Sequence, residues 1–200
     1  MKRVSMRELL ADKKMLGEFC MSMQNGAVAI LPTDTLYGFA VAANRQAAVS
    51  RIYQIKNRSA QKPLILFIHE IAELKRIGFE ILPGVYDVLL EHWPGALTAI
   101  LKKPDHESLS CFDFPTLGVR IPAHAELLQL LAALPVKLLT TSANRSGDPS
   151  DIDPENIARE FLHEIDWFVD GGVLAGALPS TVADFTVRPP KVLRQGGLIL

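Results

Sequence analysis

The stretch Ala27-Val28-Ala29-Ile30-Leu31-Pro32-Thr33-Asp34-Thr35 (residues 27–35) sets the pattern on which the fold prediction depends. Five apolar residues in a row predict a short strand buried on both faces, and the proline that follows ends it. Polar residues come immediately after the strand, as they do where a turn carries binding groups outside a strand end. The same order, an apolar strand and then a polar turn, returns further along the chain.

These apolar runs alternate with helical patterns. Apolar residues at a spacing near 3.6 predict helices, and one helix start is clear at Asp153-Pro154-Glu155, where a capping carboxylate precedes a proline in the first turn. The predicted strands are residues 27–31, 36–42, 63–68, 96–101, 117–121, 136–141, 168–170, 181–185 and 191–194, and the predicted helices are residues 6–24, 45–56, 70–77, 83–92 and 124–134. Continuous apolar strands alternating with helices indicate an α/β protein whose sheet is covered on both faces.

Length and composition restrict the classes of protein that remain. The chain has 200 residues, 48% of them hydrophobic and 22% charged, which suits one compact domain and excludes a disordered or collagen-like chain. Its 21 basic and 22 acidic residues give a net charge of −1, so the chain as a whole has no attraction for nucleic acid or membrane. Any anion site must therefore come from a local arrangement of charge.

Cysteine, histidine and targeting patterns indicate a reducing compartment. Cys20 and Cys111 lie far apart in the sequence, and the five histidines show no metal-ligand spacing. The N-terminus is charged and lacks the apolar core of a signal peptide, and no apolar run approaches the ~20 residues of a membrane span. We expect a soluble cytoplasmic protein without a membrane partner and without a zinc site.

Standard nucleotide and hydrolase motifs are missing from the sequence. It has no G-x-x-x-x-G-K-[ST] loop, no G-x-G-x-x-G fingerprint and no G-x-S-x-G elbow. A protein of this sequence that handles a nucleotide must use another scaffold.

Positive charge is concentrated between Thr35 and His69, a stretch without Asp or Glu. It contains five cations: Arg45, Arg51, Lys56, Arg58 and Lys62. Arg45 and Arg51 fit a solvated helix face, whereas Lys56-Asn57-Arg58 follows the helix in a turn, where side chains are often used for binding. A lysine and an arginine there suit a polyphosphate or a carboxylate, although a solvated turn explains them as well.

Polar turns adjoin three of the predicted strands, at residues 32–35, 140–147 and 179–181. In any single turn, Ser, Thr, Asn and Asp are explained by their hydrogen bonds to backbone groups. Three such turns together with a cationic turn favour a polar pocket, because α/β proteins bind ligands outside strand ends.

Two arginines have two interpretations each. Arg120 lies in the apolar run Gly118-Val119-Arg120-Ile121-Pro122, where a buried guanidinium group needs a partner. That partner is either an internal carboxylate such as Asp34 or the carboxylate of a ligand. Arg194 is ambiguous in the same way, whereas Trp93-Pro94-Gly95 fits a structural helix end.

Seven short motifs occur in order along the chain: PTDTLYGFA (32–40), KNR followed by KPLIL (56–66), WPGALT (93–98), GVRIP (118–122), TTSANRSG (140–147), PSTVADF (179–185) and LRQGG (193–197). Together, over about residues 10–198, they resemble the YrdC/Sua5 family, the L-threonylcarbamoyladenylate synthases. The resemblance implies one YrdC-like domain over residues 1–200, with an α/β fold in which a twisted mixed sheet is covered by helices and carries a concave basic groove. The length is similar to the short YrdC-type form, without the C-terminal second domain of Sua5-type members.

The resemblance also implies a reaction. Members of the family join L-threonine, bicarbonate and ATP, with Mg²⁺, to give threonylcarbamoyladenylate and pyrophosphate for the t6A modification of tRNA. Such a protein would work with tRNA and the t6A transfer machinery. Two alternatives remain: a module of the same family that binds double-stranded RNA, tRNA or the ribosome, and a paralogue with another carbamoylated acceptor.

The roles of individual residues follow from the motifs by resemblance. Lys56 and Arg58 would be catalytic. The nucleotide would be bound by Arg58, Lys62, Thr116, Ser142, Asn144, Ser150 and Arg194, and threonine by Thr35, Phe67, Arg120, Thr140 and Ser180. No side chain would ligate the metal directly, since Mg²⁺ would arrive with ATP. Phe67 departs from the family pattern, because many members of the family have a histidine at this position.

The chemistry of the residues agrees with such a reaction. Forming an acyl-adenylate needs positioning and charge neutralisation more than a general base. The sequence offers many cations and hydroxyls and no Ser/His/Asp triad. We expect no covalent intermediate on the protein.

Overall fold

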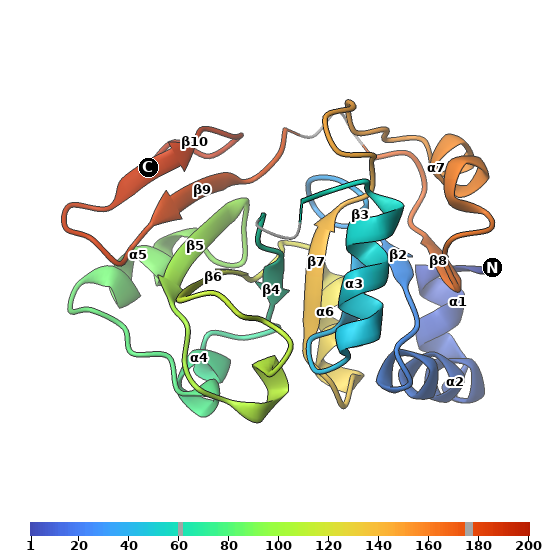
Figure 1. The fold of residues 1–200 in the computed structure, drawn as a ribbon, viewed down its shortest axis with the longest axis horizontal. Helices are drawn as coiled ribbons and strands as arrows, with labels where there is room; N and C mark the ends of the chain where they lie inside the picture. Colours follow the sequence, from blue (N-terminus) through green and yellow to red (C-terminus); the bar gives the residue numbers. More distant parts are fainter. Residues whose placement is uncertain (60–61, 175–177) are drawn as a thin grey trace.

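A twisted mixed β-sheet with helices on both faces forms the body of the molecule (Figure 1), which confirms the predicted α/β architecture. The computed structural model describes residues 1–59, 62–174 and 178–200. Within them, ten strands lie in the order β1-β8-β2-β3-β7-β4-β6-β5-β9-β10. The strands are β1 (Lys2–Ser5), β2 (Ala29–Leu31), β3 (Gly38–Ala42), β4 (Ile65–Phe67), β5 (Leu97–Lys102), β6 (Thr116–Arg120), β7 (Leu138–Ser142), β8 (Trp167–Asp170), β9 (Thr181–Asp184) and β10 (Lys191–Arg194). The helices are α1 (Met6–Ala11), α2 (Lys13–Gln24), α3 (Gln46–Ile55), α4 (Ala72–Ile77), α5 (Val85–His92), α6 (Ala125–Ala133), α7 (Pro154–Phe161) and the 3-10 helix η1 (Glu107–Leu109).

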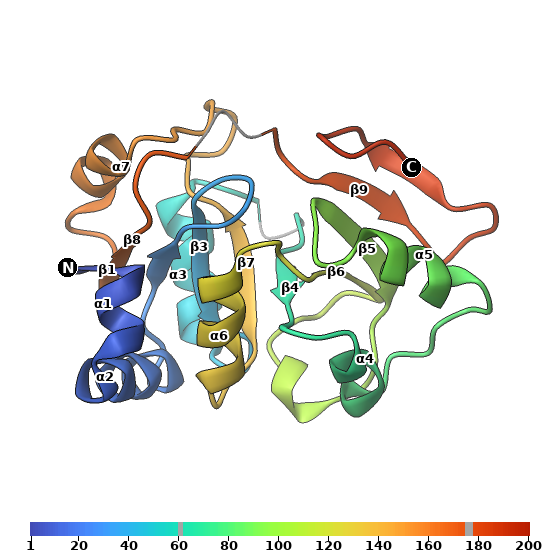
Figure 2. The ribbon, with the colours of Figure 1, turned by 180° about the vertical axis from the view of Figure 1, so that it is seen from behind.

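Two apolar layers hold these helices against the sheet. One layer packs α1, α2 and α6 through residues such as Leu9, Phe19 and Leu130, and the other packs α3 and α7 through Ile52 and Phe161. Figures 1 and 2 show α3 and α6 on opposite faces of β7. The central strands are therefore buried on both sides, as their unbroken apolar runs predicted. In the described ranges, no helix is long and apolar enough to cross a membrane.

The N-terminal helix differs from the prediction. Residues 6–24 were expected to form one helix, but the chain breaks at Asp12, which ends α1 in an extended conformation and begins α2. The Asp12 carboxylate accepts hydrogen bonds from the backbone N–H groups of Lys14 and Met15, so a capping residue inside the periodic pattern starts a second helix. The short strand β1, which the sequence analysis did not predict, pairs with β8 at the sheet edge.

The register of the central strands brings the site residues onto one face. Ile65 pairs with Thr140 on one side and with Gly118 on the other, and Gly38 pairs with Ser142. Residues two apart along a strand point to the same face. Phe67, Arg120 and Ser142 therefore extend the face that Ile65, Gly118 and Thr140 begin.

Candidate functional site

A cavity of about 460 Å³ lies over these central strands. All three predicted polar turns contribute to its wall, at residues 32–35, 140–147 and 179–181, so the sequence prediction of one polar pocket is confirmed. The structure brings nine of the predicted site residues into this wall: Thr35, Arg58, Phe67, Arg120, Thr140, Ser142, Ser150, Ser180 and Arg194.

Four predicted site residues do not line the cavity. Lys56 and Asn144 lie directly behind the turn that carries Ser142. Lys62 is exposed, and Thr116 begins β6, at the opposite end of that strand from Arg120. Binding roles for these four residues stay predictions.

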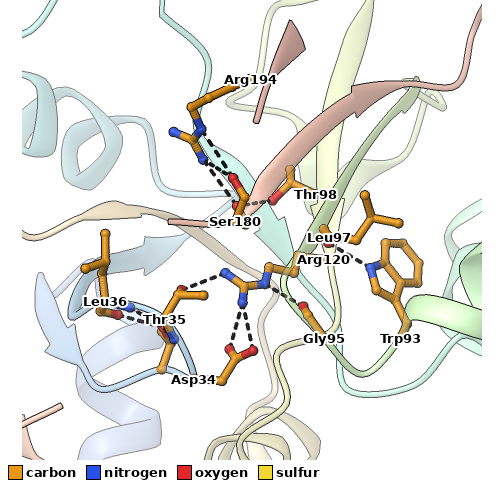
Figure 3. A network of polar contacts seen from close by, with 11 residues as sticks. Asp34, Thr35, Leu36, Trp93, Gly95, Leu97, Thr98, Arg120, Ser180 and Arg194 are labelled. Carbon is orange, nitrogen blue, oxygen red and sulfur yellow. Dashed lines mark hydrogen bonds and ion pairs between the residues drawn. The ribbon is translucent and has the colours of Figure 1, made fainter. Parts of the chain in front are cut away.

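Arg120 is the most fully bonded side chain of the wall, and only 4% of its surface is exposed. Its Nη2 atom donates to both carboxylate oxygens of Asp34 at 2.8 Å, and its Nε atom donates to the carbonyl oxygen of Gly95 at 2.9 Å (Figure 3). Its Nη1 atom donates to the Thr35 hydroxyl at 2.9 Å and carries a second N–H. The internal pairing with Asp34 that the sequence left open is thus present, and one N–H remains for a ligand.

The turn after β2 presents Thr35 to the cavity. Thr33 stabilises this turn, because its hydroxyl donates to the carbonyl oxygen of Leu36 at 2.7 Å and accepts the backbone N–H groups of Thr35 and Leu36. The Thr35 hydroxyl accepts the Arg120 bond, so its own proton is directed either to Thr33, 3.0 Å away, or to a ligand. Thr35 is therefore a hydrogen-bond donor at the cavity surface.

Arg194 and Ser180 form the far wall of the cavity. The Nη2 atom of Arg194 donates to the carbonyl oxygen of Ser180 at 2.8 Å and to its hydroxyl at 3.2 Å. That hydroxyl lies 2.9 Å from the hydroxyl of Thr98, which is buried at the start of β5 (Figure 3). Gly196 lets the C-terminal segment approach this wall, since a Cβ atom there would lie 2.1 Å from the carbonyl oxygen of Pro179.

Lys56 is a buried cation behind the Ser142–Asn144 turn, with 1% of its surface exposed. Its Nζ atom donates to the carbonyl oxygens of Ser142 at 2.5 Å and Asn144 at 2.6 Å, and to the Asn144 side-chain oxygen at 3.2 Å. Burial lowers the pKa of Lys56 to about 7, and the nearby charges of Arg58 and Arg145 act in the same direction. The lysine thus fixes the turn that places the Ser142 hydroxyl at the cavity.

Arg58 reaches the cavity from the turn after α3. Its guanidinium group donates to the carbonyl oxygens of Lys62 at 3.4 Å and Pro63 at 3.1 Å. Burial lowers the pKa of Arg58, and the charge of Arg194 adds to that effect. Unlike Arg120, Arg58 has carbonyl partners that leave its positive charge uncompensated among the residues that the structure describes.

Arg51 lies on a partly exposed face of α3, in agreement with the prediction, and 36% of its side chain is exposed. Its charge is nevertheless paired, because its Nη1 atom donates to the Asp166 carboxylate at 2.6 Å and its Nη2 atom to the carbonyl oxygen of Glu164 at 2.6 Å. Arg45 also donates to a backbone oxygen, that of Gln24 at 2.5 Å. The carboxylate that pairs with Arg51 comes from Asp166, far away in the sequence. The acid-free stretch therefore does not form a single positive surface.

Two contributors were missed from the sequence. Thr98 supports Ser180 from behind the wall, and Tyr37 lines the cavity while its hydroxyl contacts Gly171 N at 2.9 Å and Gly172 O at 2.8 Å. Both lie within quoted motifs, WPGALT and PTDTLYGFA. Their hydroxyls in otherwise apolar runs were the available signal.

The wall as a whole suits anions. Of the described residues that line it, three are charged, and all three are arginines: Arg58, Arg120 and Arg194. The described ranges hold no cluster of three or more His, Cys, Asp or Glu side chains suited to a metal ion. Arginine forks and hydroxyls without carboxylates are typical of phosphate and carboxylate binding.

Comparison with known proteins identifies the family. The Sua5/YciO/YrdC family model, described as "Telomere recombination", matches residues 21–196. The chain belongs to the Sua5/YciO/YrdC family. This agrees with the resemblance that the seven motifs indicated.

Relatives within the Sua5/YciO/YrdC family have the same fold, and their similarity extends over most of this chain. A threonylcarbamoyl-AMP synthase of Pyrococcus abyssi is 35% identical over 179 residues, which are 89% of this chain and 53% of that protein. One of Bacillus subtilis is 32% identical over 96% of this chain and 56% of its own length. The crystal structure of P. abyssi Sua5 complexed with L-threonine matches with a TM-score of 0.84 and 32% identity, over 94% of this chain and 55% of that one. The chain thus spans about half the length of these relatives.

Proposed function

We propose that this protein makes L-threonylcarbamoyladenylate from L-threonine, bicarbonate and ATP, with release of pyrophosphate, for the t6A modification of tRNA. The observation that carries the proposal is the wall of one cavity, in which Arg58 and Arg194 lie beside Arg120 and Thr35. The names of its relatives and the threonine complex of P. abyssi Sua5 support it. The cytoplasmic location predicted from the sequence is part of the same proposal.

The amino acid would bind at the Arg120 end of the cavity. The remaining N–H of Arg120 and the Thr35 hydroxyl that accepts from the same nitrogen lie side by side at the cavity, and together they would suit the carboxylate of threonine. Thr140, Ser180 and Phe67 also line the cavity and would enclose the side chain of the substrate.

The phosphates of ATP would bind at the other cations. Arg58 and Arg194 supply charge that no carboxylate offsets within the described chain, and the hydroxyl of Ser150 adds a hydrogen-bond donor. The hydroxyl proton of Ser142 is donated to the Asn144 side-chain oxygen, so Ser142 would offer its oxygen as an acceptor. Lys56 and Asn144 would act by fixing the turn of Ser142.

The reaction itself would need little proton transfer from the protein. The amino nitrogen of threonine would bond to the carbon of bicarbonate as water leaves and the extra proton passes to solvent, which gives a carbamate. An oxygen of that carbamate would attack the α-phosphorus, so that an O–P bond forms as the bond from the α-phosphorus to the leaving pyrophosphate breaks. The charge that develops on pyrophosphate would lie at Arg58 and Arg194, since preorganised cations stabilise such charge. Arg120 would hold threonine still, so that the attacking oxygen stays in line.

Magnesium fits this site as a companion of the nucleotide. In nucleotide sites Mg²⁺ is held through phosphates, waters and one or two protein ligands. The wall offers the hydroxyl oxygen of Ser142 but, among its described residues, no carboxylate. The ion would neutralise phosphate charge there, and Ser142 is the residue that would meet its hydration shell.

The test is pyrophosphate release by the purified protein. We expect release only when ATP, threonine and bicarbonate are present together. An RNA-binding module would release none under any combination, and a paralogue with another acceptor would release pyrophosphate with a different amino acid in place of threonine. Either result contradicts the proposal.

A further inference from the structure

The three arginines of the cavity differ in how their charge is balanced. Arg58 and Arg194 donate to carbonyl and hydroxyl oxygens, which carry no net charge. Arg120 donates to both oxygens of Asp34 at 2.8 Å, and 12% of the Asp34 side chain is exposed. In the described part of the wall, Arg120 alone has a carboxylate partner.

Asp34 stands behind Arg120 and not in the cavity wall. The residues on both sides of it, Thr33 and Thr35, line the cavity, whereas Asp34 does not. Figure 3 shows its carboxylate against the Nη2 edge of Arg120, with Thr35 at Nη1 and Gly95 at Nε. Three protein partners therefore fix the plane of the guanidinium group and direct the remaining N–H of Nη1.

The arginines also share one electrostatic environment. Burial lowers the pKa of Arg120, Asp34 opposes that effect, and the charge of Arg194 adds to it. Arg194 likewise acts on Arg58. Without Asp34, the described wall of the cavity would present three uncompensated cations, and a polyphosphate would be attracted to all of them.

We infer that Asp34 is a positioning residue that divides the cavity by charge. It leaves a cationic half at Arg58 and Arg194 for the polyphosphate and an electrically balanced half at Arg120 for a zwitterionic amino acid. The inference rests on the proposed function, because it assigns the two substrates to the two halves. It explains how one arginine-rich cavity keeps the nucleotide out of the amino-acid position.

The test is calorimetric titration of the full chain with L-threonine and with inorganic tripolyphosphate, in the wild type, Asp34→Asn, Asp34→Glu and the exposed control Asp113→Asn. In the wild type and the control, we expect the two ligands to bind independently. In Asp34→Asn, we expect the Kd of threonine to rise about tenfold, that of tripolyphosphate to fall about fivefold, and the ligands to compete. Asp34→Glu, which keeps the charge, should restore independent binding.

If Asp34 had a purely structural role, the Asp34→Asn substitution would weaken the binding of threonine and of tripolyphosphate together. That result, or an Asp34→Asn variant with unchanged constants and no competition, would overturn the inference. A wild type that binds neither ligand overturns both the inference and the proposed function. A wild type that binds both independently but releases no pyrophosphate contradicts the proposed function and leaves the division by charge in place.

The wild type alone decides the question if Asp34→Asn does not fold, since removing one partner of a buried ion pair is costly. Between 50 and 300 mM KCl, we expect the Kd of tripolyphosphate to rise at least about tenfold and that of threonine to change less than about twofold, because salt screens binding between net charges. If the Kd of threonine rose in step with that of tripolyphosphate, the Arg120 half would not be balanced and the inference would be wrong.

Discussion

The Nζ atom of Lys56 lies 2.5 Å from the carbonyl oxygen of Ser142, although the two residues are 86 positions apart. The contact joins the turn after α3 to the turn after β7. Together these turns place Arg58 and Ser142 in one cavity wall. Lys56, for whose turn the sequence suggested a polyphosphate or a carboxylate as ligand, therefore acts in this geometry on the shape of the cavity wall.

Replacing Lys56 should separate this role from stability in general. Lys56→Met keeps most of the buried volume but removes three hydrogen bonds from the turn. The Ser142 carbonyl oxygen keeps the Asn144 N–H and the Asn144 amide oxygen keeps the Ser142 hydroxyl, so among the described contacts it is the Asn144 carbonyl oxygen that loses its donor, at a cost of about 1–3 kcal/mol. We expect pyrophosphate release to fall at least about 100-fold in protein that is still folded by circular dichroism. The exposed control Lys75→Met should retain wild-type release, and equal activity in both variants would contradict the role of Lys56.

The pH dependence of stability should also report on Lys56. Its pKa is about 7 in the folded protein because of burial, against about 10.4 in an unfolded chain. Between these values the unfolded chain binds more protons, so the free energy of unfolding rises with pH from about 7 toward 10. Urea unfolding at pH 6.5 and 9.5 should show a larger rise for the wild type than for Lys56→Met. An identical rise in both proteins would contradict the lowered pKa.

Thr98 should influence the binding of ATP through its contact with Ser180, which in turn contacts Arg194. Thr98→Val removes the hydroxyl that lies 2.9 Å from that of Ser180 while keeping the shape of the side chain. We expect a loss of stability of about 1 kcal/mol and a KM for ATP that rises about tenfold with little change in kcat. Thr98→Ser, which retains the hydroxyl, should restore the KM, and a variant whose kcat fell instead would point to a different role.

The two glycines of the C-terminal motif should respond differently to the same change. A Cβ atom at Gly196 would lie 2.1 Å from the carbonyl oxygen of Pro179, whereas one at Gly197 would meet the Cβ of Leu178 at an ordinary 3.5 Å. Gly196→Ala should push the segment that carries Arg194 away from Ser180 and weaken ATP binding at least about tenfold. Gly197→Ala should bind ATP as the wild type does, and comparable binding by both variants would contradict the close approach.

Much of this site could be predicted from the sequence, because its parts are local. The strands are unbroken apolar runs, and polar turns follow them, so the position of Thr35 and Ser142 at a pocket was accessible from pattern alone. The orientation of Lys56 away from the cavity could not be predicted in this way, because it depends on three oxygen atoms of residues that lie 86 and 88 positions later in the sequence.

The pairing of charged side chains was the second feature that could not be predicted from the sequence. The partner of Arg51 is Asp166, and the pairing of Arg120 with Asp34 was one of two open alternatives. Each depends on long-range contacts that only the folded sheet creates. The acid-free stretch thus showed where the cations lie in the sequence. It did not show which of them keep a charge that no carboxylate compensates in the folded protein.

The most direct test of the proposed function is mass spectrometry of the products formed from ATP, L-threonine and ¹³C-labelled bicarbonate. We expect threonylcarbamoyladenylate that carries the label, in amounts equal to the pyrophosphate released, and none from Arg58→Ala or Arg120→Ala protein that remains folded. Unlabelled adenylate, or no adenylate from the folded wild type, would contradict the account.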